Sequence, residues 1–166
     1  TATNGLFALL PAALHGKMED TAPFARCDEA CWGEIYRRSS VQGVLAVAWD
    51  GLQMLPGELR PPRALLLEWA FNVEQIEKRY RRHEAAVTRL AAFYHKHGFP
   101  MMLLKGYGLS LSYPVSSHRP FGDIDIWLYG RQPEADRVVA RGLGLRIGEG
   151  KGHHTTFLFD SIVVGK

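Results

Sequence analysis

The first part of the chain carries apolar residues at spacings of three and four, the pattern of amphipathic helices. Helices are predicted over Asp28–Arg38 and Val41–Leu55, and a connector rich in proline follows them. From Arg63 the same spacing continues without interruption, which predicts one long amphipathic helix that ends at Gly98. Residues 1–98 are therefore expected to form a helical region.

After this point the pattern changes to short apolar runs and strict alternation. Strands are predicted over Phe99–Lys105, Asp123–Leu128, His153–Phe159 and Ile162–Val164. Short helices are predicted between them, over residues 106–113 and 133–141, and the last two strands are expected to form a hairpin that turns at Asp160-Ser161. The fold class is therefore α+β, a helical N-terminal region followed by a small mixed-sheet core over residues 99–166.

Composition narrows the class of protein without defining a function. The chain has 166 residues, 46% of them hydrophobic and 22% charged, which fits one domain or two small ones and excludes a disordered chain. An apolar stretch near the N-terminus has no basic residues ahead of it and is interrupted by Pro11, so we expect an ordinary helix there and not a secretory signal. No apolar run is long enough to span a membrane.

The chain has two cysteines, Cys27 and Cys31, four residues apart. They cannot form a disulfide framework, and a zinc site would need two further ligands at a spacing that is absent. We expect idle or buried thiols with no disulfide partner, and hold a metal or redox role as the less favoured alternative. Free thiols would place the protein in a reducing compartment, the cytoplasm.

The net charge of +3 is concentrated in the long helix. Basic residues outnumber acidic ones between Glu74 and Lys96, and the basic residues are Lys78, Arg79, Arg81, Arg82, Arg89 and Lys96. Such a face can attract phosphates or nucleic acid. The alternative is a solvated helix face, since Glu77 and Arg81 have the spacing of a helical ion pair.

The most informative chemistry lies in the strand that contains Asp123 and Asp125. Residues i and i+2 of a strand project from one face with Cα atoms roughly 6.5 Å apart, so the two carboxylates can converge to about 4 Å. At that separation they repel by about 4 kcal/mol at an effective dielectric constant of 20. A divalent cation between them would relieve this repulsion, and Mg²⁺ typically binds one or two carboxylates together with substrate phosphates.

Other residues around this pair strengthen the interpretation. The motifs are Leu104-Lys105-Gly106, Leu109, Tyr113-Pro114, Arg119-Pro120 and Asp123-Ile124-Asp125-Ile126. In this order they resemble the nucleotidyltransferase superfamily of polymerase-β type, and most closely its branch of uncharacterised nucleotidyltransferases, which also carries a helical region before the motif. The resemblance covers residues 61–166 best.

The resemblance implies a polymerase-β-like core in which Asp123 and Asp125 are catalytic and hold Mg²⁺ or Mn²⁺. It also implies a backbone turn at Gly106 close to the triphosphate of an NTP, with Lys105, Ser110 and Arg119 as further nucleotide-binding candidates. For Lys105 and Arg119 the alternative is a surface base or an ion pair with an aspartate. His153 and His154 are weaker candidates for substrate contacts.

One feature of the superfamily is missing from its expected position. A third carboxylate usually lies on a later strand, but Ile162–Val164 is followed by Gly165 and Lys166, and Asp160 lies earlier, in the expected turn. The core is therefore either truncated at its C-terminus or has lost a catalytic ligand.

Three functions remain open. The first is an enzyme that transfers a nucleoside monophosphate from an NTP to a small molecule, a protein or RNA, and the second is a catalytically degenerate binding module. The third is a nucleic-acid binder that uses the basic helix face.

Overall fold

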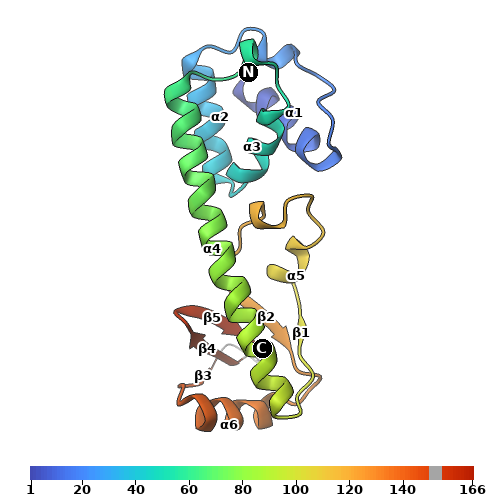
Figure 1. Cartoon of the computed structure of the whole chain (residues 1–166), viewed down its shortest axis with the longest axis vertical. Helices are drawn as coiled ribbons and strands as arrows, with labels where there is room; N and C mark the ends of the chain where they lie inside the picture. The colour runs from blue at the N-terminus through green and yellow to red at the C-terminus, as the bar shows by residue number, and fades with distance from the viewer. Residues whose placement is uncertain (150–154) are drawn as a thin grey trace. The chain divides into compact units, whose positions relative to one another are not determined.

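The computed structural model describes residues 1–149 and 155–166 (Figure 1). Its helical elements are α1 (Ala2–His15), η1 (Ala22–Phe24), α2 (Glu29–Val41), α3 (Leu45–Gln53), η2 (Gly57–Leu59), α4 (Arg63–Lys96), α5 (Tyr107–Ser110), η3 (Ser116–His118) and α6 (Gln132–Leu143). Its strands are β1 (Met102–Leu103), β2 (Ile124–Trp127), β3 (Gly148–Glu149), β4 (Thr155–Phe159) and β5 (Ile162–Gly165). The α+β class and the order of helical region and sheet are confirmed.

The ends of the helices follow from local chemistry. Helix α2 begins after Asp28, whose Oδ1 accepts a hydrogen bond from the backbone N–H of Cys31 at 2.8 Å. The long helix α4 ends where the N–H of Phe99 reaches the carbonyl of Tyr94, with Gly98 in the left-handed region at φ 74°. The single long helix predicted from the apolar spacing is therefore present.

The chain folds into two compact units that divide helix α4 between them. The first contains residues 1–78 and 113–120, and the second contains residues 79–112 and 121–166. The domain boundary expected at residue 98 separates the helical part of the sequence from the part that contains strands. The two compact units instead divide within α4, between residues 78 and 79. The reason is packing, because Val87, Leu90 and Tyr94 of α4 are buried in the same core as the strands.

The core of the first unit is built around large side chains. Trp32, Trp69 and Leu52 are almost completely buried there, and the indole N–H of Trp69 donates to the carbonyl of Leu45 at 2.9 Å. Helices α1 and α3 approach so closely that a Cβ on Gly51 would lie 2.2 Å from the carbonyl oxygen of Leu9. Glycine at position 51 therefore permits this helix contact.

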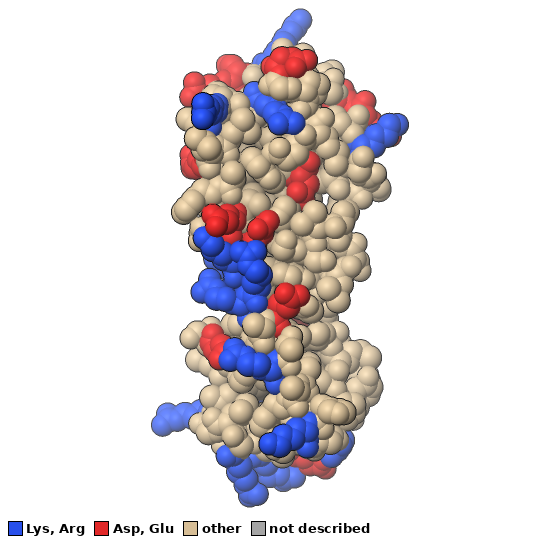
Figure 2. Space-filling view, viewed as in Figure 1, with Lys and Arg blue, Asp and Glu red and all other residues tan. Residues whose placement is uncertain are grey.

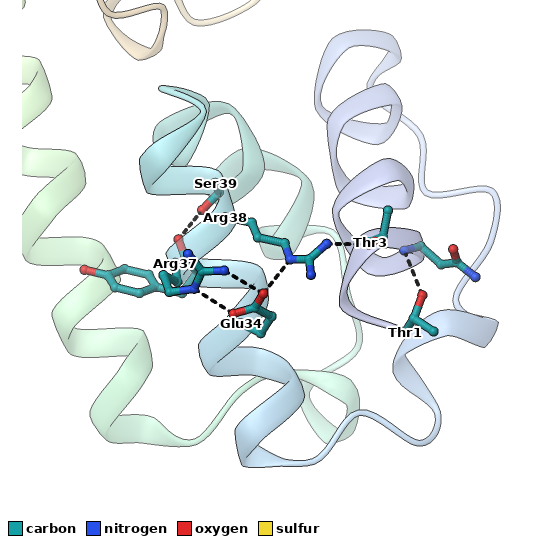
Figure 3. A network of polar contacts seen from close by, with 8 residues as sticks. Thr1, Thr3, Glu34, Arg37, Arg38 and Ser39 are labelled. Carbon is teal, nitrogen blue, oxygen red and sulfur yellow. Dashed lines mark hydrogen bonds and ion pairs between the residues drawn. The ribbon is translucent and has the colours of Figure 1, made fainter.

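Charged side chains join helices α1 and α2 at the surface of the first unit (Figure 3). Glu34 accepts hydrogen bonds from Arg37 at 2.7 Å and from Arg38 at 2.6 Å, and Arg38 also donates to the hydroxyl of Thr3 at 2.6 Å. The bond from Arg37, followed by that from Arg38, lowers the pKa of Glu34 to about 2. This exposed network orients two arginines from one helix.

The two cysteines differ from the prediction made from the sequence. Cys27 and Cys31 form a disulfide, with Cα atoms 5.3 Å apart, so the prediction of idle thiols without a disulfide partner is wrong. Cys27 precedes helix α2 instead of lying within it, because the N-cap residue Asp28 between them has an extended backbone with φ −75° and ψ −179°. The cytoplasmic location expected from free thiols loses that support.

Across the described residues, none of the helices is both long enough and apolar enough to cross a membrane.

The second unit contains a mixed sheet. Within the described residues its strand order is β1-β2-β5-β4-β3, with β2 and β5 parallel and the other pairs antiparallel. Asp160 and Ser161 make the β4–β5 turn with φ values of 51° and 65°, as expected for the tightest hairpins. The buried side chains of β2, β4 and β5 share one core with apolar residues of α4 and α6. This packing covers one face of the sheet.

In the first unit, His118 of η3 lies between two carboxylates. Its Nδ1 is 2.8 Å from Oδ2 of Asp50, and its Nε2 is 3.0 Å from Oε1 of Glu77. Burial alone would lower the pKa of this imidazole, but the hydrogen bonds with Asp50 and Glu77 outweigh it and raise the pKa above the ordinary value of 6.5. The clamp ties the segment 113–120 to helices α3 and α4 within the unit.

Replacement of Gly51 by alanine is expected to lower the free energy of unfolding by about 1–3 kcal/mol, because the new methyl group meets backbone atoms of Leu9. Urea unfolding followed by circular dichroism measures the change. Gly33→Ala is the matched control, since Gly33 is also helical and a Cβ on it would have no atom within 4 Å. Equal stability of the two variants would contradict the close contact of α1 and α3.

The His118 clamp predicts a pH dependence of stability. Because the folded pKa is raised, this contribution is complete below pH 6.5 and is lost as the pH rises through the folded pKa. At pH 6, His118→Gln is expected to cost about 2 kcal/mol of unfolding free energy. Urea titrations between pH 6 and pH 9 should show a smaller loss of stability with pH in the variant than in the parent chain, and identical slopes would contradict the clamp.

Candidate functional site

Strand β2 places the two aspartates on the face of the sheet opposite the core. Ile124 and Ile126 are buried at 0% and 1% exposure, whereas Asp123 and Trp127 are exposed and Asp125 is partly buried. Side chains alternate along a strand, so burial of the isoleucines directs Asp123, Asp125 and Trp127 to the other side. The alternation predicted from the sequence is confirmed by the burial of these residues.

A cleft of about 590 Å³ lies on this face of the second unit. Strands and loops contribute its lining residues, which are Leu104, Lys105, Asp123, Asp125, Ile126, Trp127, Gln132, Thr156, Val163, Gly165 and Lys166. The cleft therefore collects both predicted carboxylates and the predicted base Lys105. Of the described lining residues, only Asp123 and Asp125 are acidic.

Asp125 is the more enclosed of the two carboxylates. Its Oδ2 is buried without a hydrogen-bond partner, and it forms an ion pair with Nζ of Lys105 at 3.4 Å. Gly165 lies opposite Asp125 in the β2–β5 register, and a Cβ on Gly165 would be 3.3 Å from Oδ1 of Asp125. A neighbouring strand without a side chain at this position leaves space beside the carboxylate.

The turn between β1 and α5 requires glycine. Gly106 has φ 64° and ψ −114°, a backbone conformation that is essentially restricted to glycine. Its carbonyl accepts the N–H of Ser110 at 3.1 Å, which closes the first turn of α5. The position where a Cβ of Gly106 would lie is 3.4 Å from the carbonyl oxygen of Asp123, so the turn lies next to the backbone of the acidic strand.

An aromatic cluster supports the turn and the start of β2. Tyr80 of α4 stacks on Tyr107 with ring centroids 5.5 Å apart, and both rings meet Phe121 edge-on. His83 of α4 has Nε2 3.3 Å from the carbonyl oxygen of Gly122, the residue before Asp123. These contacts hold the residue after Gly106 and the residues before β2 against helix α4.

Tyr107 is linked to helix α4 by a polar contact as well. Its hydroxyl donates to Oε1 of Glu84 at 3.1 Å. Burial, followed by the hydrogen bond with Glu84, raises the pKa of Tyr107 to about 12. The phenol therefore stays neutral and keeps its donor at any physiological pH.

Two other candidate residues, Ser110 and Arg119, are not among the residues that line the cleft. Ser110 is completely buried, and its hydroxyl donates to the carbonyl of Tyr107 at 2.6 Å and lies 3.2 Å from the hydroxyl of Tyr80. Arg119 belongs to the first unit, where it lines a separate pocket of about 240 Å³ with residues of α1 and α3. His153 and His154 lie outside the described residues. Lys105 and Gly106 are thus the nucleotide-binding candidates closest to the acidic pair.

Strand β5 occupies the place next to the acidic pair. Its cleft-facing residues are Val163 and Gly165, and no carboxylate occurs within Ile162–Gly165. Asp160 lies in the preceding turn and is paired with Arg89 of α4. Within the described residues, the cleft therefore offers two carboxylates instead of three.

The two carboxylates suit a divalent cation that is completed by other ligands. The buried Oδ2 of Asp125 accepts no hydrogen bond, and Asp123 is exposed beside it on the same face. Residues 1–149 and 155–166 contain no group of three or more His, Cys, Asp and Glu side chains that could hold a metal. Carboxylate pairs of this kind match Mg²⁺, which is held by one or two carboxylates, water and substrate phosphates.

Several lining residues were missed by the sequence analysis. Gln132 and Thr156 belong to no recognisable motif. The only signal for Trp127 was the alternation of the strand, which places it on the same face as Asp123 and Asp125. Lys166 is buried, pairs with Asp136 and has its ammonium 4.6 Å from the Phe157 ring. Burial lowers the pKa of Lys166, and the hydrogen bond to Asp136 opposes this effect.

The class of protein is shown by the comparison with protein families. The family model described as uncharacterised nucleotidyltransferase matches residues 28–162, and the chain belongs to this family. The match includes both aspartates, Gly106 and Lys105. No curated protein and no solved structure is significantly similar to the chain.

Replacement of Gly106 by alanine is expected to lower the free energy of unfolding by about 1–3 kcal/mol, because alanine cannot adopt the Gly106 backbone conformation without strain. Gly122→Ala is the matched control, since Gly122 is also close to Asp123 and has no atom near its Cβ position. Chemical unfolding of both variants measures the difference. A Gly106→Ala variant as stable as Gly122→Ala would contradict the requirement for glycine in this turn.

Proposed function

We propose that this chain is a divalent-metal-dependent nucleotidyltransferase that transfers a nucleoside monophosphate from an NTP to an acceptor. The observation that carries the proposal is the arrangement of Asp123 and Asp125 on the open face of β2, with the Gly106 turn beside them. In the reaction, an acceptor nucleophile forms a bond to the α-phosphorus, the bond to the bridging oxygen breaks, and pyrophosphate leaves.

The chain's residues have distinct roles in this proposal. Asp123 and Asp125 hold Mg²⁺ or Mn²⁺, which when bound neutralises phosphate charge and acts as a Lewis acid. Lys105 pairs with Asp125 at 3.4 Å and is otherwise exposed, so its flexible side chain can turn to a phosphate once a cation balances the carboxylates. The Gly106 turn allows close approach of the backbone to the triphosphate.

A second candidate function is a binding module that keeps nucleotide affinity without turnover. The specific observation in its favour is strand β5, which presents Gly165 opposite Asp125 and contributes no carboxylate to the cleft. The superfamily resemblance places a third carboxylate on a later strand, as a base or an additional metal ligand. The two functions differ in the release of pyrophosphate and agree in metal-dependent NTP binding.

The acceptor is a small molecule, a protein side chain or RNA. Basic side chains gather along helix α4 on the face shown in Figure 2. Among the basic residues of this helix, Arg79, Arg81 and Arg82 are exposed. Lys78 pairs with Glu74 at 2.8 Å, which is the contact expected of a solvated helix face. The exposed arginines support an RNA acceptor or plain nucleic-acid binding, either of which would weaken steeply with salt.

Isothermal titration calorimetry with each NTP in the presence and absence of Mg²⁺ tests the proposal. The parent chain should bind at least one NTP only with the metal. Asp125→Asn and Asp123→Asn should each weaken this binding at least about tenfold, because each removes an anionic metal ligand while keeping the side-chain shape.

Asp160→Asn is the control, since Asp160 is an acid of the same unit that pairs with Arg89 outside the cleft. It should bind NTP as the parent chain does. The proposal would be overturned if NTP affinity were the same with and without the metal and in both aspartate variants. A pyrophosphate-release assay on the parent chain then separates the transferase from the binding module.

A further inference from the structure

Trp127 stands beside the acidic pair on the same strand face. It follows Asp125 by two positions, so their side chains project to the same side with Cα atoms roughly 6.5 Å apart. Both residues line the cleft, and the indole keeps 42% of its surface exposed. A large aromatic side chain is thus presented at the wall of the candidate site instead of being buried in the core.

The indole is held in place from one side. Its ring centroid lies 4.4 Å from that of Tyr129, with the two planes inclined by 31°. Tyr129 itself sits at φ 54°, in the left-handed region, within the turn that follows β2. The turn therefore brings a second aromatic ring against Trp127, and the two rings form an exposed aromatic surface on the strand that carries Asp125.

One neighbour of Trp127 on this face of the sheet is apolar, since Met102 lies opposite it in the β1–β2 register and is 41% exposed. Two further apolar residues of the cleft lie toward the aspartates, because Leu104 donates its N–H to the carbonyl of Asp125 and Val163 precedes Val164, the partner of Ile124. The cleft thus has its carboxylates at Asp123 and Asp125 and an aromatic side chain two positions further along β2, at Trp127. A nucleotide has the same division, since its charged phosphates are separated from a flat aromatic base by one sugar.

We propose that Trp127, supported by Tyr129, is the stacking platform for the base of the bound nucleotide. The inference rests on the proposed function, because it places the phosphates at the metal held by Asp123 and Asp125. Stacking uses the π-face that every base has, so the site is expected to accept purines and pyrimidines and to prefer the larger purine ring.

The test compares ligands with and without a base. ATP, GTP, CTP, UTP and inorganic tripolyphosphate are titrated with Mg²⁺ into the parent chain and into Trp127→Ala, Trp127→Leu and Trp127→Phe. The alanine and leucine variants should bind NTP about tenfold more weakly and tripolyphosphate unchanged, because only the aromatic contact is lost. The phenylalanine variant keeps an aromatic face and should retain affinity within about threefold.

Phe71→Ala is the matched control, since it removes an aromatic side chain that is 60% exposed and does not line the cleft. It should leave the affinity for both ligands unchanged. Sedimentation of all variants reports whether Trp127 instead mediates contact with a second copy of the chain.

The outcomes distinguish the two proposals. If the parent chain binds NTP and tripolyphosphate equally well, or if Trp127→Ala weakens both alike or neither, the stacking platform is wrong while the metal-dependent phosphate site stands. If the parent chain binds neither ligand, both proposals fall. Loss of self-association in Trp127→Ala with unchanged NTP affinity would assign the aromatic surface to an interface between copies.

Discussion

The candidate site depends on one constraint, the alternation of side chains along β2. Ile124, Ile126 and Leu128 are completely or almost completely buried in the core with α4 and α6. Because a strand has only two faces, burying these residues forces the intervening aspartates and Trp127 outward. A shift of register by one residue would bury two carboxylates at a cost of many kcal/mol. The hydrophobic core thus determines where the acidic pair lies.

The surrounding elements turn this placement into a cleft. Strand β5 runs parallel to β2 and presents Gly165 opposite Asp125, so the carboxylate has space at its side. The Gly106 turn and the cluster of Tyr80, His83 and Tyr107 hold the start of β2 from the other direction. The second half of α4 is therefore part of the site's scaffold, although its sequence belongs to the helical region.

The chain belongs to the nucleotidyltransferase family, and the proposed function assigns metal-dependent chemistry to its cleft. Under that proposal the contribution of β5 is the central chemical question, because a site with two carboxylates would obtain its remaining metal ligands from substrate phosphates and water. The buried Oδ2 of Asp125 accepts no hydrogen bond, and the exposed ammonium of Lys105 lies 3.4 Å from it. In the proposed function this oxygen is a ligand position that is completed when substrate and cation bind.

Local patterns in the chain were sufficient to predict the long helix α4 and the alternating strand β2, because each depends on neighbouring residues and backbone preferences. The projection of Asp123 and Asp125 from one strand face could be predicted for the same reason, whereas the turn at Gly106 and the candidate base Lys105 came from the resemblance to nucleotidyltransferases. The Cys27–Cys31 disulfide could not be predicted, since the pattern of apolar residues does not show whether a cysteine before the helix pairs with one inside it. Pairing of β2 with β5, the enclosure of Ser110 and the aromatic wall at Trp127 arise from contacts between distant segments. Only the tertiary structure decides those, because burial and strand register are properties of the packed chain.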